Sequence, residues 1–146
     1  MVLFRTNNPW KKAICMMFRV KSRLDMSILH ATLATRNVDA TVGFFHSVFG
    51  WQVIKYPSNV SLKAGWLRID DQQELHVVEA ADFEPSVCER EYGRHIALSF
   101  PESRWEELQR RLVAAGAELI EPQRDTPFRR LFFRDPNGYV FEVIAR

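Results

Sequence analysis

Hydrophobic and polar positions alternate in two ways along this chain. From residue 28 onward, stretches with a period of two, which is typical of strands, surround two stretches with a period near 3.6, which is typical of helices. In the first helical stretch, Val38, Val42, Phe45 and Phe49 fall on one face, and Gly50 follows in the position that often ends a helix. The pattern therefore predicts one amphipathic helix in each half of the chain.

The predicted elements repeat in the same order. Strands are expected at residues 28–34, 51–56, 60–69 and 74–78, and again at residues 94–100, 117–120, 128–134 and 139–144. The second helix carries its apolar face on Trp105, Leu108, Leu112 and Ala115, and Gly116 ends it, 66 positions after Gly50. The residues Asp135-Pro136-Asn137-Gly138 form a strong turn signal before the last strand. This order predicts an α+β fold of two tandem βαβββ modules.

The repeat brings polar residues of the predicted strands into correspondence. His30 and His95 lie 65 positions apart on the first strand of each half, and His76 and Glu142 lie 66 positions apart on the last. Glu142 alone is readily explained as a solvated strand residue, because an unpaired buried charge costs several kcal/mol. Three imidazoles and a carboxylate at matching positions instead favour a divalent metal site with Ni, Zn, Co or Fe(II). We therefore expect the two mixed sheets to curve around a shared metal-binding cleft. His46 has no counterpart and is interpreted as structural.

Composition narrows the classes of function. The chain has 146 residues, 47% of them hydrophobic, which suits one globular domain. The first 25 residues hold six Lys or Arg and one Asp, so they are interpreted as a basic extension outside a core domain over residues 26–146. The mildly acidic remainder argues against a nucleic-acid partner, and no stretch has the apolar length of a membrane span. Two cysteines without a CxxC pattern, Cys15 and Cys88, favour a cytoplasmic protein.

Two motifs resemble one known superfamily. The end of the chain, RDPNGYVFEVI, is similar to the terminal hairpin of the vicinal oxygen chelate superfamily, and GRHIALSF is similar to its HIAL strand. That superfamily includes glyoxalase I, fosfomycin-resistance proteins, extradiol dioxygenases and bleomycin-resistance proteins. The resemblance covers residues 27–146 and implies metal ligands at His30, His76, His95 and Glu142, with Glu142 also the candidate catalytic residue.

The resemblance leaves the reaction open, because this fold hosts several chemistries. A metal-dependent glyoxalase-type lyase, isomerase or transferase acting on a small oxygenated substrate is the first hypothesis. An Fe(II)-dependent extradiol-type dioxygenase and a metal-free drug-binding resistance protein are the alternatives. Two departures argue against ordinary glyoxalase I: Ala34 stands where that enzyme has Arg, and His76 where it has Glu. If His76 stays off the metal, the other three residues form a 2-His-1-carboxylate set.

The sequence gives weaker signals for substrate-binding residues than for metal ligands. Trp66 and Arg68 in the first half, and Arg129 or Arg130 before the final hairpin, are candidate substrate-binding residues, since Arg can hold a carboxylate or phosphonate with two hydrogen bonds. The serine-rich potassium loop of a fosfomycin transferase has no obvious counterpart.

Small members of the superfamily often form dimers whose sites draw one half from each chain, so the resemblance also implies a homodimer.

Overall fold

A computed structural model describes residues 27–146, which contain both predicted modules. The first module comprises β1 (His30–Thr35), α2 (Val38–Phe49), β2 (Gln52–Ile54), β3 (Ala64–Arg68) and β4 (Glu74–Glu79). The second comprises β5 (Ile96–Phe100), the 3-10 turn η1 (Glu102–Arg104), α3 (Trp105–Ala114), β6 (Glu118–Ile120), β7 (Arg130–Arg134) and β8 (Val140–Ala145). The expectation of a basic extension at residues 1–25 lies outside the described residues.

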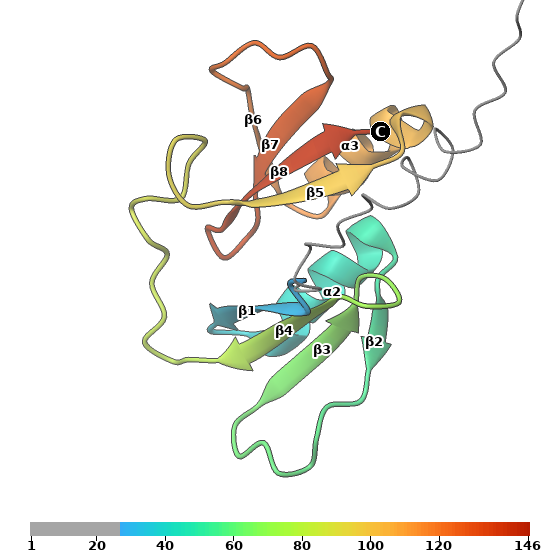
Figure 1. Ribbon diagram of the computed structural model, residues 1–146. Helices are drawn as coiled ribbons and strands as arrows, with labels where there is room; N and C mark the ends of the chain where they lie inside the picture. The colour runs from blue at the N-terminus through green and yellow to red at the C-terminus, as the bar shows by residue number, and fades with distance from the viewer. Residues whose placement is uncertain (1–26) are drawn as a thin grey trace, which may run out of the picture.

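Each module forms one four-stranded mixed sheet, as the α+β prediction required. The strand orders are β1-β4-β3-β2 and β5-β8-β7-β6, so the two halves have the same topology. In each sheet the first strand runs parallel to the last, and the remaining pairs are antiparallel. Figure 1 shows the two modules one above the other, joined by the long connection between β4 and β5. The two predicted βαβββ modules are confirmed.

The helix cap and the glycine turn positions that the sequence indicated are present in the structure. The Asn37 side chain caps α2 by accepting a hydrogen bond from the Ala40 N–H at 3.0 Å, and Gly50 closes the helix with φ 75°. Gly138 takes φ 95° in the hairpin turn before β8. Several expected strands are shorter. Residues 60–69 yield only Ala64–Arg68, because the preceding residues form the loop that returns from β2, and residues 51–56 yield only Gln52–Ile54.

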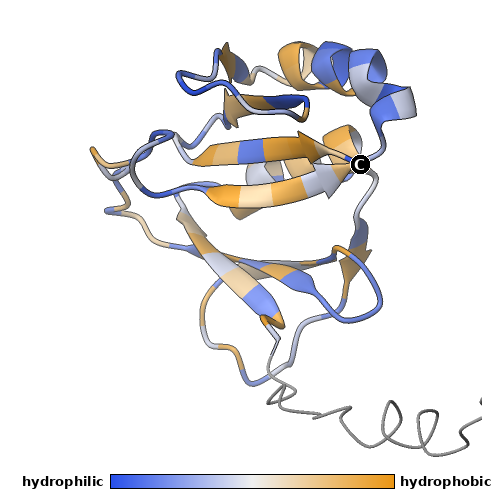
Figure 2. Ribbon diagram, turned by 45° about the horizontal axis from the view of Figure 1, so that its top comes forward, coloured by the Kyte–Doolittle hydropathy of each residue, from blue (hydrophilic) through white to orange (hydrophobic). Residues whose placement is uncertain are grey.

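A single hydrophobic core joins the two modules. Phe45 of α2 meets Phe141 of β8 edge-on, with ring centroids 5.3 Å apart, and Phe44 lies 6.2 Å from Phe133 of β7. The first helix therefore packs against the second sheet as well as its own. Figure 2 shows the strands as largely apolar bands interrupted by single hydrophilic positions. These hydrophilic positions do not belong to the hydrophobic core.

Polar contacts also fix the modules to each other. The Tyr139 hydroxyl donates to the Ala34 carbonyl and accepts from the Ala34 N–H, both at 3.0 Å. Asn137, in the turn before β8, contacts Thr35 and Thr41 of the first module. The final hairpin is thus attached to the start of the chain's first module, and the two sheets keep a defined orientation. No helix within residues 27–146 is long and apolar enough to cross a membrane.

Candidate functional site

The candidate ligands on the last strands lie on the sheet faces turned away from the shared core. On β4, Leu75 and Val77 enter the core, so His76 between them projects to the opposite face. On β8, Phe141 and Val143 enter the core, and Glu142 projects to the opposite face. Strand alternation therefore places both repeat mates on the outer faces of their sheets.

In the second module, His95 and Glu142 form a close pair. His95 immediately precedes β5, which lies beside β8, and its Nε2 is 3.6 Å from Glu142 Oε2. Glu142 is only 7% exposed, so the solvated explanation of this carboxylate is wrong. The His95 ring packs edge-on against Phe132, with centroids 5.3 Å apart. The carboxylate and imidazole are thus held in a partly apolar setting.

The other oxygen of Glu142 is held by a buried arginine. Arg130 Nη1 donates to Glu142 Oε1 at 2.9 Å, and Nη2 donates to Glu91 and to the Arg124 carbonyl. The side chain of Arg130 is only 4% exposed. The hydrogen bond to Glu142 and that to Glu91 keep the pKa of Arg130 above its ordinary value despite burial. Glu142 therefore already has a cationic partner on one side.

Glu91 completes this buried triad from the connection between the modules. Burial raises the pKa of the Glu91 carboxyl, but hydrogen bonds from the Gln123 backbone N–H and from Arg130 outweigh it, so the pKa lies below its ordinary value. The two carboxylates share one guanidinium, and one negative charge remains formally uncompensated. An additional cation beside Glu142 would balance it.

The donor set of this pair fits a divalent ion. Glu142 Oε2 is not used by Arg130 and faces His95 Nε2. Two ligand atoms that each lie about 2.1 Å from a common ion are ~3.0–3.4 Å from each other. The observed distance of 3.6 Å between His95 Nε2 and Glu142 Oε2 is close to this range. His95 Nδ1 is buried and has no hydrogen-bond partner among residues 27–146, so nothing in the described chain fixes this ring from its other nitrogen. One histidine and one carboxylate are too few for a complete site.

In the first module, the other two histidines stack on each other. The His76 ring lies between Trp66, with centroids 3.7 Å apart and planes inclined by 7°, and His30, with centroids 4.2 Å apart and planes inclined by 15°. The side chain of His76 is 12% exposed, whereas His30 at the start of β1 is exposed. The three rings come from the adjacent strands β3, β4 and β1.

The same face carries a salt bridge that touches the stack. His76 Nε2 lies 3.0 Å from Glu74 Oε2, and Arg68 lies 3.5 Å from the other Glu74 oxygen. The hydrogen bond from His76 lowers the pKa of Glu74 below its ordinary value; partial burial opposes it and Arg68 adds to it.

Stacking prevents His30 and His76 from sharing one ion. The lone pair of an imidazole nitrogen lies in the ring plane, and the two planes are nearly parallel and stacked. An ion in the plane of one ring is therefore out of the plane of the other, and a metal–nitrogen bond of about 2.1 Å cannot span the gap. Within residues 27–146 of one chain, no group of three or more His, Cys, Asp or Glu side chains lies together as a metal site. The four candidate ligands therefore do not converge within the described part of one chain, and a site shared between two chains stays a prediction.

The substrate-binding candidates have different surroundings. Trp66 is part of the stack, and Arg130 has its Nη groups engaged by Glu91, Glu142 and a carbonyl. Arg129 donates to Glu106 at 3.1 Å and contacts neither His95 nor Glu142 by a hydrogen bond. Arg68, with its side chain 49% exposed, retains donors for a ligand. It also lines a 750 Å³ cavity between the modules.

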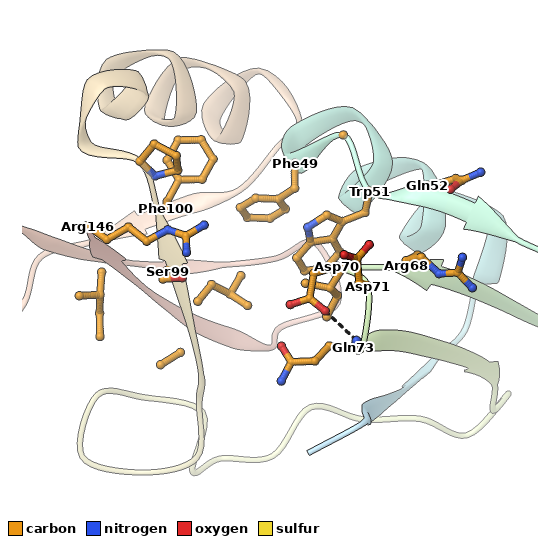
Figure 3. Close-up of a pocket in the computed structure, with 16 residues that line it drawn as sticks. Phe49, Trp51, Gln52, Arg68, Asp70, Asp71, Gln73, Ser99, Phe100 and Arg146 are labelled. Carbon is orange, nitrogen blue, oxygen red and sulfur yellow. Dashed lines mark hydrogen bonds between the residues drawn. The ribbon is translucent and has the colours of Figure 1, made fainter. Parts of the chain in front are cut away.

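That cavity is separate from the candidate ligands. Figure 3 shows Phe49 and Trp51 of the first module and Phe100 and Arg146 of the second around it, and none of the four candidate ligands lines it. His46 belongs neither to the ring stack nor to the His95–Glu142 pair: its Nδ1 lies 2.8 Å from the Trp51 carbonyl oxygen, which agrees with a structural role.

Sequence reasoning missed two carboxylates. Glu74 stands two positions before His76 on the same strand face, and that spacing could have identified it as a partner. Glu91 lies in a connection without periodicity, and no local signal marks it.

Comparisons with known proteins agree with this fold. The model of the Glyoxalase/Bleomycin resistance protein/Dioxygenase superfamily matches residues 27–143. Metallothiol transferase FosB from Shouchella clausii is 29% identical over 122 residues, which cover 80% of this chain and 77% of the relative.

Solved structures of fosfomycin resistance proteins have the same fold. FosX from Mesorhizobium loti superposes with a TM-score of 0.66 at 18% identity, covering 82% of this chain and 91% of that one. A FosX variant from Listeria monocytogenes, complexed with Mn(II) and 1S,2S-dihydroxypropylphosphonic acid, gives a TM-score of 0.64 at 24% identity, covering 82% and 89%. At these identities the structural likeness concerns the fold alone.

Proposed function

This chain belongs to the Glyoxalase/Bleomycin resistance protein/Dioxygenase superfamily, and from that membership we propose that it is a metal-dependent enzyme acting on a small oxygenated substrate. The observation that carries the proposal is the buried Glu142 carboxylate, which Arg130 holds by one oxygen while the other faces His95 Nε2 at 3.6 Å. A buried carboxylate oxygen that faces an imidazole nitrogen supplies, together with it, two ligands of the type that divalent transition metals bind.

The ligand set we propose is His30, His95 and Glu142. The stack argues against His76 as a fourth ligand alongside His30, because the two ring planes are nearly parallel. Two imidazoles and one carboxylate suit Mn, Fe(II), Co, Ni or Zn, and they leave coordination positions open for substrate oxygens. The Mn(II) complex of the Listeria protein supports a divalent ion in this family.

We propose that the site forms between two copies of the chain. In one chain the second-module pair and the first-module stack lie on separate sheets, without a group of three potential ligands among residues 27–146. The edge strands β1, which begins at His30, and β5, which begins directly after His95, pair on only one side in the described chain. A homodimer related by a two-fold axis would bring His30 of one copy to His95 and Glu142 of the other, twice.

The reaction class we propose is transfer or addition. Isomerase or lyase chemistry is the alternative at the same metal site. A bound divalent ion would act there as a Lewis acid toward a substrate oxygen. Arg130 fixes the direction of the Glu142 carboxylate, and Arg68 has exposed donors suited to a substrate carboxylate or phosphonate. The metallothiol transferase FosB supports thiol transfer as the first reaction to assay.

A second candidate function is Fe(II)-dependent ring cleavage. The proposed set of two histidines and one carboxylate is also the ligand set of non-haem Fe(II) oxygenases. A metal-free binding protein is the third possibility, which the buried carboxylate disfavours because a binder needs no such group. We also propose a cytoplasmic location, since Cys88 is an exposed thiol without a disulfide partner among residues 27–146.

Metal titration tests the proposal. Calorimetry of the full chain with Mn(II), Co(II), Ni(II), Zn(II) and anaerobic Fe(II) should give about one ion per chain for at least one metal. Glu142→Gln should weaken binding at least ~10-fold, because the amide keeps the shape but loses the charge. His46→Ala, which removes an imidazole outside the proposed site, should bind as wild type does. Failure of all five metals to bind would contradict a metalloenzyme.

Activity assays then separate the reactions. The metal-loaded protein should be incubated with fosfomycin and thiols or water, followed by phosphorus NMR, and with catechols under oxygen. Product from the first set supports transfer or addition, and oxygen consumption with catechols supports the dioxygenase alternative.

A further inference from the structure

The stack of Trp66, His76 and His30 is the feature that a three-ligand site leaves unexplained. Its rings come from three neighbouring strands, with centroid distances of 3.7 Å and 4.2 Å. Direct register between Trp66 and His76 across the β3–β4 pair accounts for the closer contact. His30 lies diagonally across the β1–β4 pair, where His76 is opposite Thr32. The order along the sheet therefore sets the order in the stack.

The orientation of the middle ring is fixed on two sides. Trp66 covers one face of His76, and the Nε2 edge meets Glu74 Oε2 at 3.0 Å. An ionised carboxylate only accepts hydrogen bonds, so Nε2 carries the hydrogen. A nitrogen that donates to Glu74 has no lone pair for a metal. The ring of His76 is thus a rigid, flat surface against which the exposed His30 lies.

We infer that His76 is a positioning residue, which holds the His30 ring by stacking so that His30 can bind the metal. His30 is an exposed side chain at the first position of β1 and would otherwise sample several rotamers. Contact with a fixed ring removes that freedom before the ion arrives, so binding loses less conformational entropy. Trp66 supports the same arrangement from behind, which gives it a role other than substrate contact.

This inference rests on the proposed metal function and predicts a specific pattern among variants. His76→Phe keeps an aromatic ring in the stack but has no nitrogen, whereas His76→Ala removes the ring. If His76 positions His30, the Phe variant should bind metal within about 3-fold of wild type. The Ala variant should lose about 10-fold, as groups that orient a ligand usually do.

The experiment uses calorimetric titration of the full chain with the metal that binds wild type most tightly. His30→Ala is the ligand control and should lose far more affinity than His76→Ala, and His46→Ala should lose none. Equal, severe loss in His76→Phe and His76→Ala, with metal still bound by wild type, would make His76 a ligand and overturn the inference alone. Unchanged affinity in His76→Ala would also overturn it, because the stack would then not position His30.

A second readout needs no metal. In the metal-free protein, the His30 ring protons should show ring-current shifts in proton NMR that persist in His76→Phe and disappear in His76→Ala. Unaltered His30 shifts in His76→Ala would overturn the stacking itself. If wild type shows these shifts but binds no metal, the proposed function fails and the positioning role fails with it.

Discussion

The outer faces of the two modules differ, although their backbones repeat. In the first module, the face that avoids the core carries an aromatic stack ending in an exposed histidine, His30. In the second, the equivalent face carries the buried charges of Glu142 and Arg130, joined by Glu91 from the connection. The repeat mates His76 and Glu142 thus have different surroundings: one is packed between rings and the other is bound to a guanidinium.

The difference shows what duplication preserves. The core side is retained because both sheets must bury an apolar face, and a change there costs packing energy. The outer side is free of that requirement, so each module can specialise. We conclude that equal spacing identifies corresponding positions but does not give them equal roles.

The largest expected difference between the two faces concerns their arginines. Arg130→Met should destabilise the protein by about 3–5 kcal/mol, because it leaves Glu91 and Glu142 buried without their shared cation. The matched change in the first module, Arg68→Met, should cost at most about 1 kcal/mol, because its ion pair with Glu74 is partly solvated. Urea unfolding of both variants measures the two free energies.

A control identifies the cause of the larger loss. Adding Glu91→Gln and Glu142→Gln to Arg130→Met removes the stranded charges and should restore part of the lost stability. Equal effects of Arg130→Met and Arg68→Met would contradict the contrast between a buried and a solvated face.

A smaller effect is expected from Glu91 and depends on pH. Glu91→Gln should cost about 1–3 kcal/mol at neutral pH, because the amide accepts hydrogen bonds less strongly than the carboxylate. The pKa of Glu91 is lower in the folded protein than its ordinary value of 4.5, so its ionised form stabilises the fold above that pH. This contribution is lost as the pH falls through the lower, folded-state value, where the carboxyl is protonated in both states.

Unfolding free energies at several pH values between about 7 and 3 test the sign. The gap between wild type and Glu91→Gln should narrow with acid. Glu118→Gln removes an exposed carboxylate and should change stability by no more than about 0.5 kcal/mol throughout. A gap for Glu91→Gln that widens with acid would contradict a lowered pKa.

The sequence predicted the repeating fold well because the signals are local. The period of each element, the cap at Asn37 and the glycines with positive φ all depend on neighbouring residues. It also marked the four repeat-related polar positions, of which three lie on strands and His95 directly precedes β5. The Arg130–Glu142 pair was not predicted, because a strand arginine is usually solvated and only the burial of both groups reveals the contact.

The relative placement of the modules depended on packing that no short pattern encodes. Phe45 of α2 reaches Phe141 of the second sheet, and that contact helps to set the orientation of the two ligand-bearing faces. The expectation that the two sheets curve around a shared cleft did not specify whether that cleft lies within one chain or between two. Stacking of His30 on His76 is likewise a side-chain conformation that strand alternation leaves undetermined.

The central claim, that His30 of one copy joins His95 and Glu142 of another, is tested most directly by mixing two variants. His30→Ala and Glu142→Gln chains should each bind little metal alone. Mixed in equal amounts and allowed to exchange subunits, half of the dimers are mixed and each regains one of its two sites, so about one quarter of wild-type metal content should return. Glu142→Gln mixed with His95→Ala, both in the second module, should regain none. No recovery in the first mixture, under conditions where subunit exchange is demonstrated, would contradict a site shared between two chains.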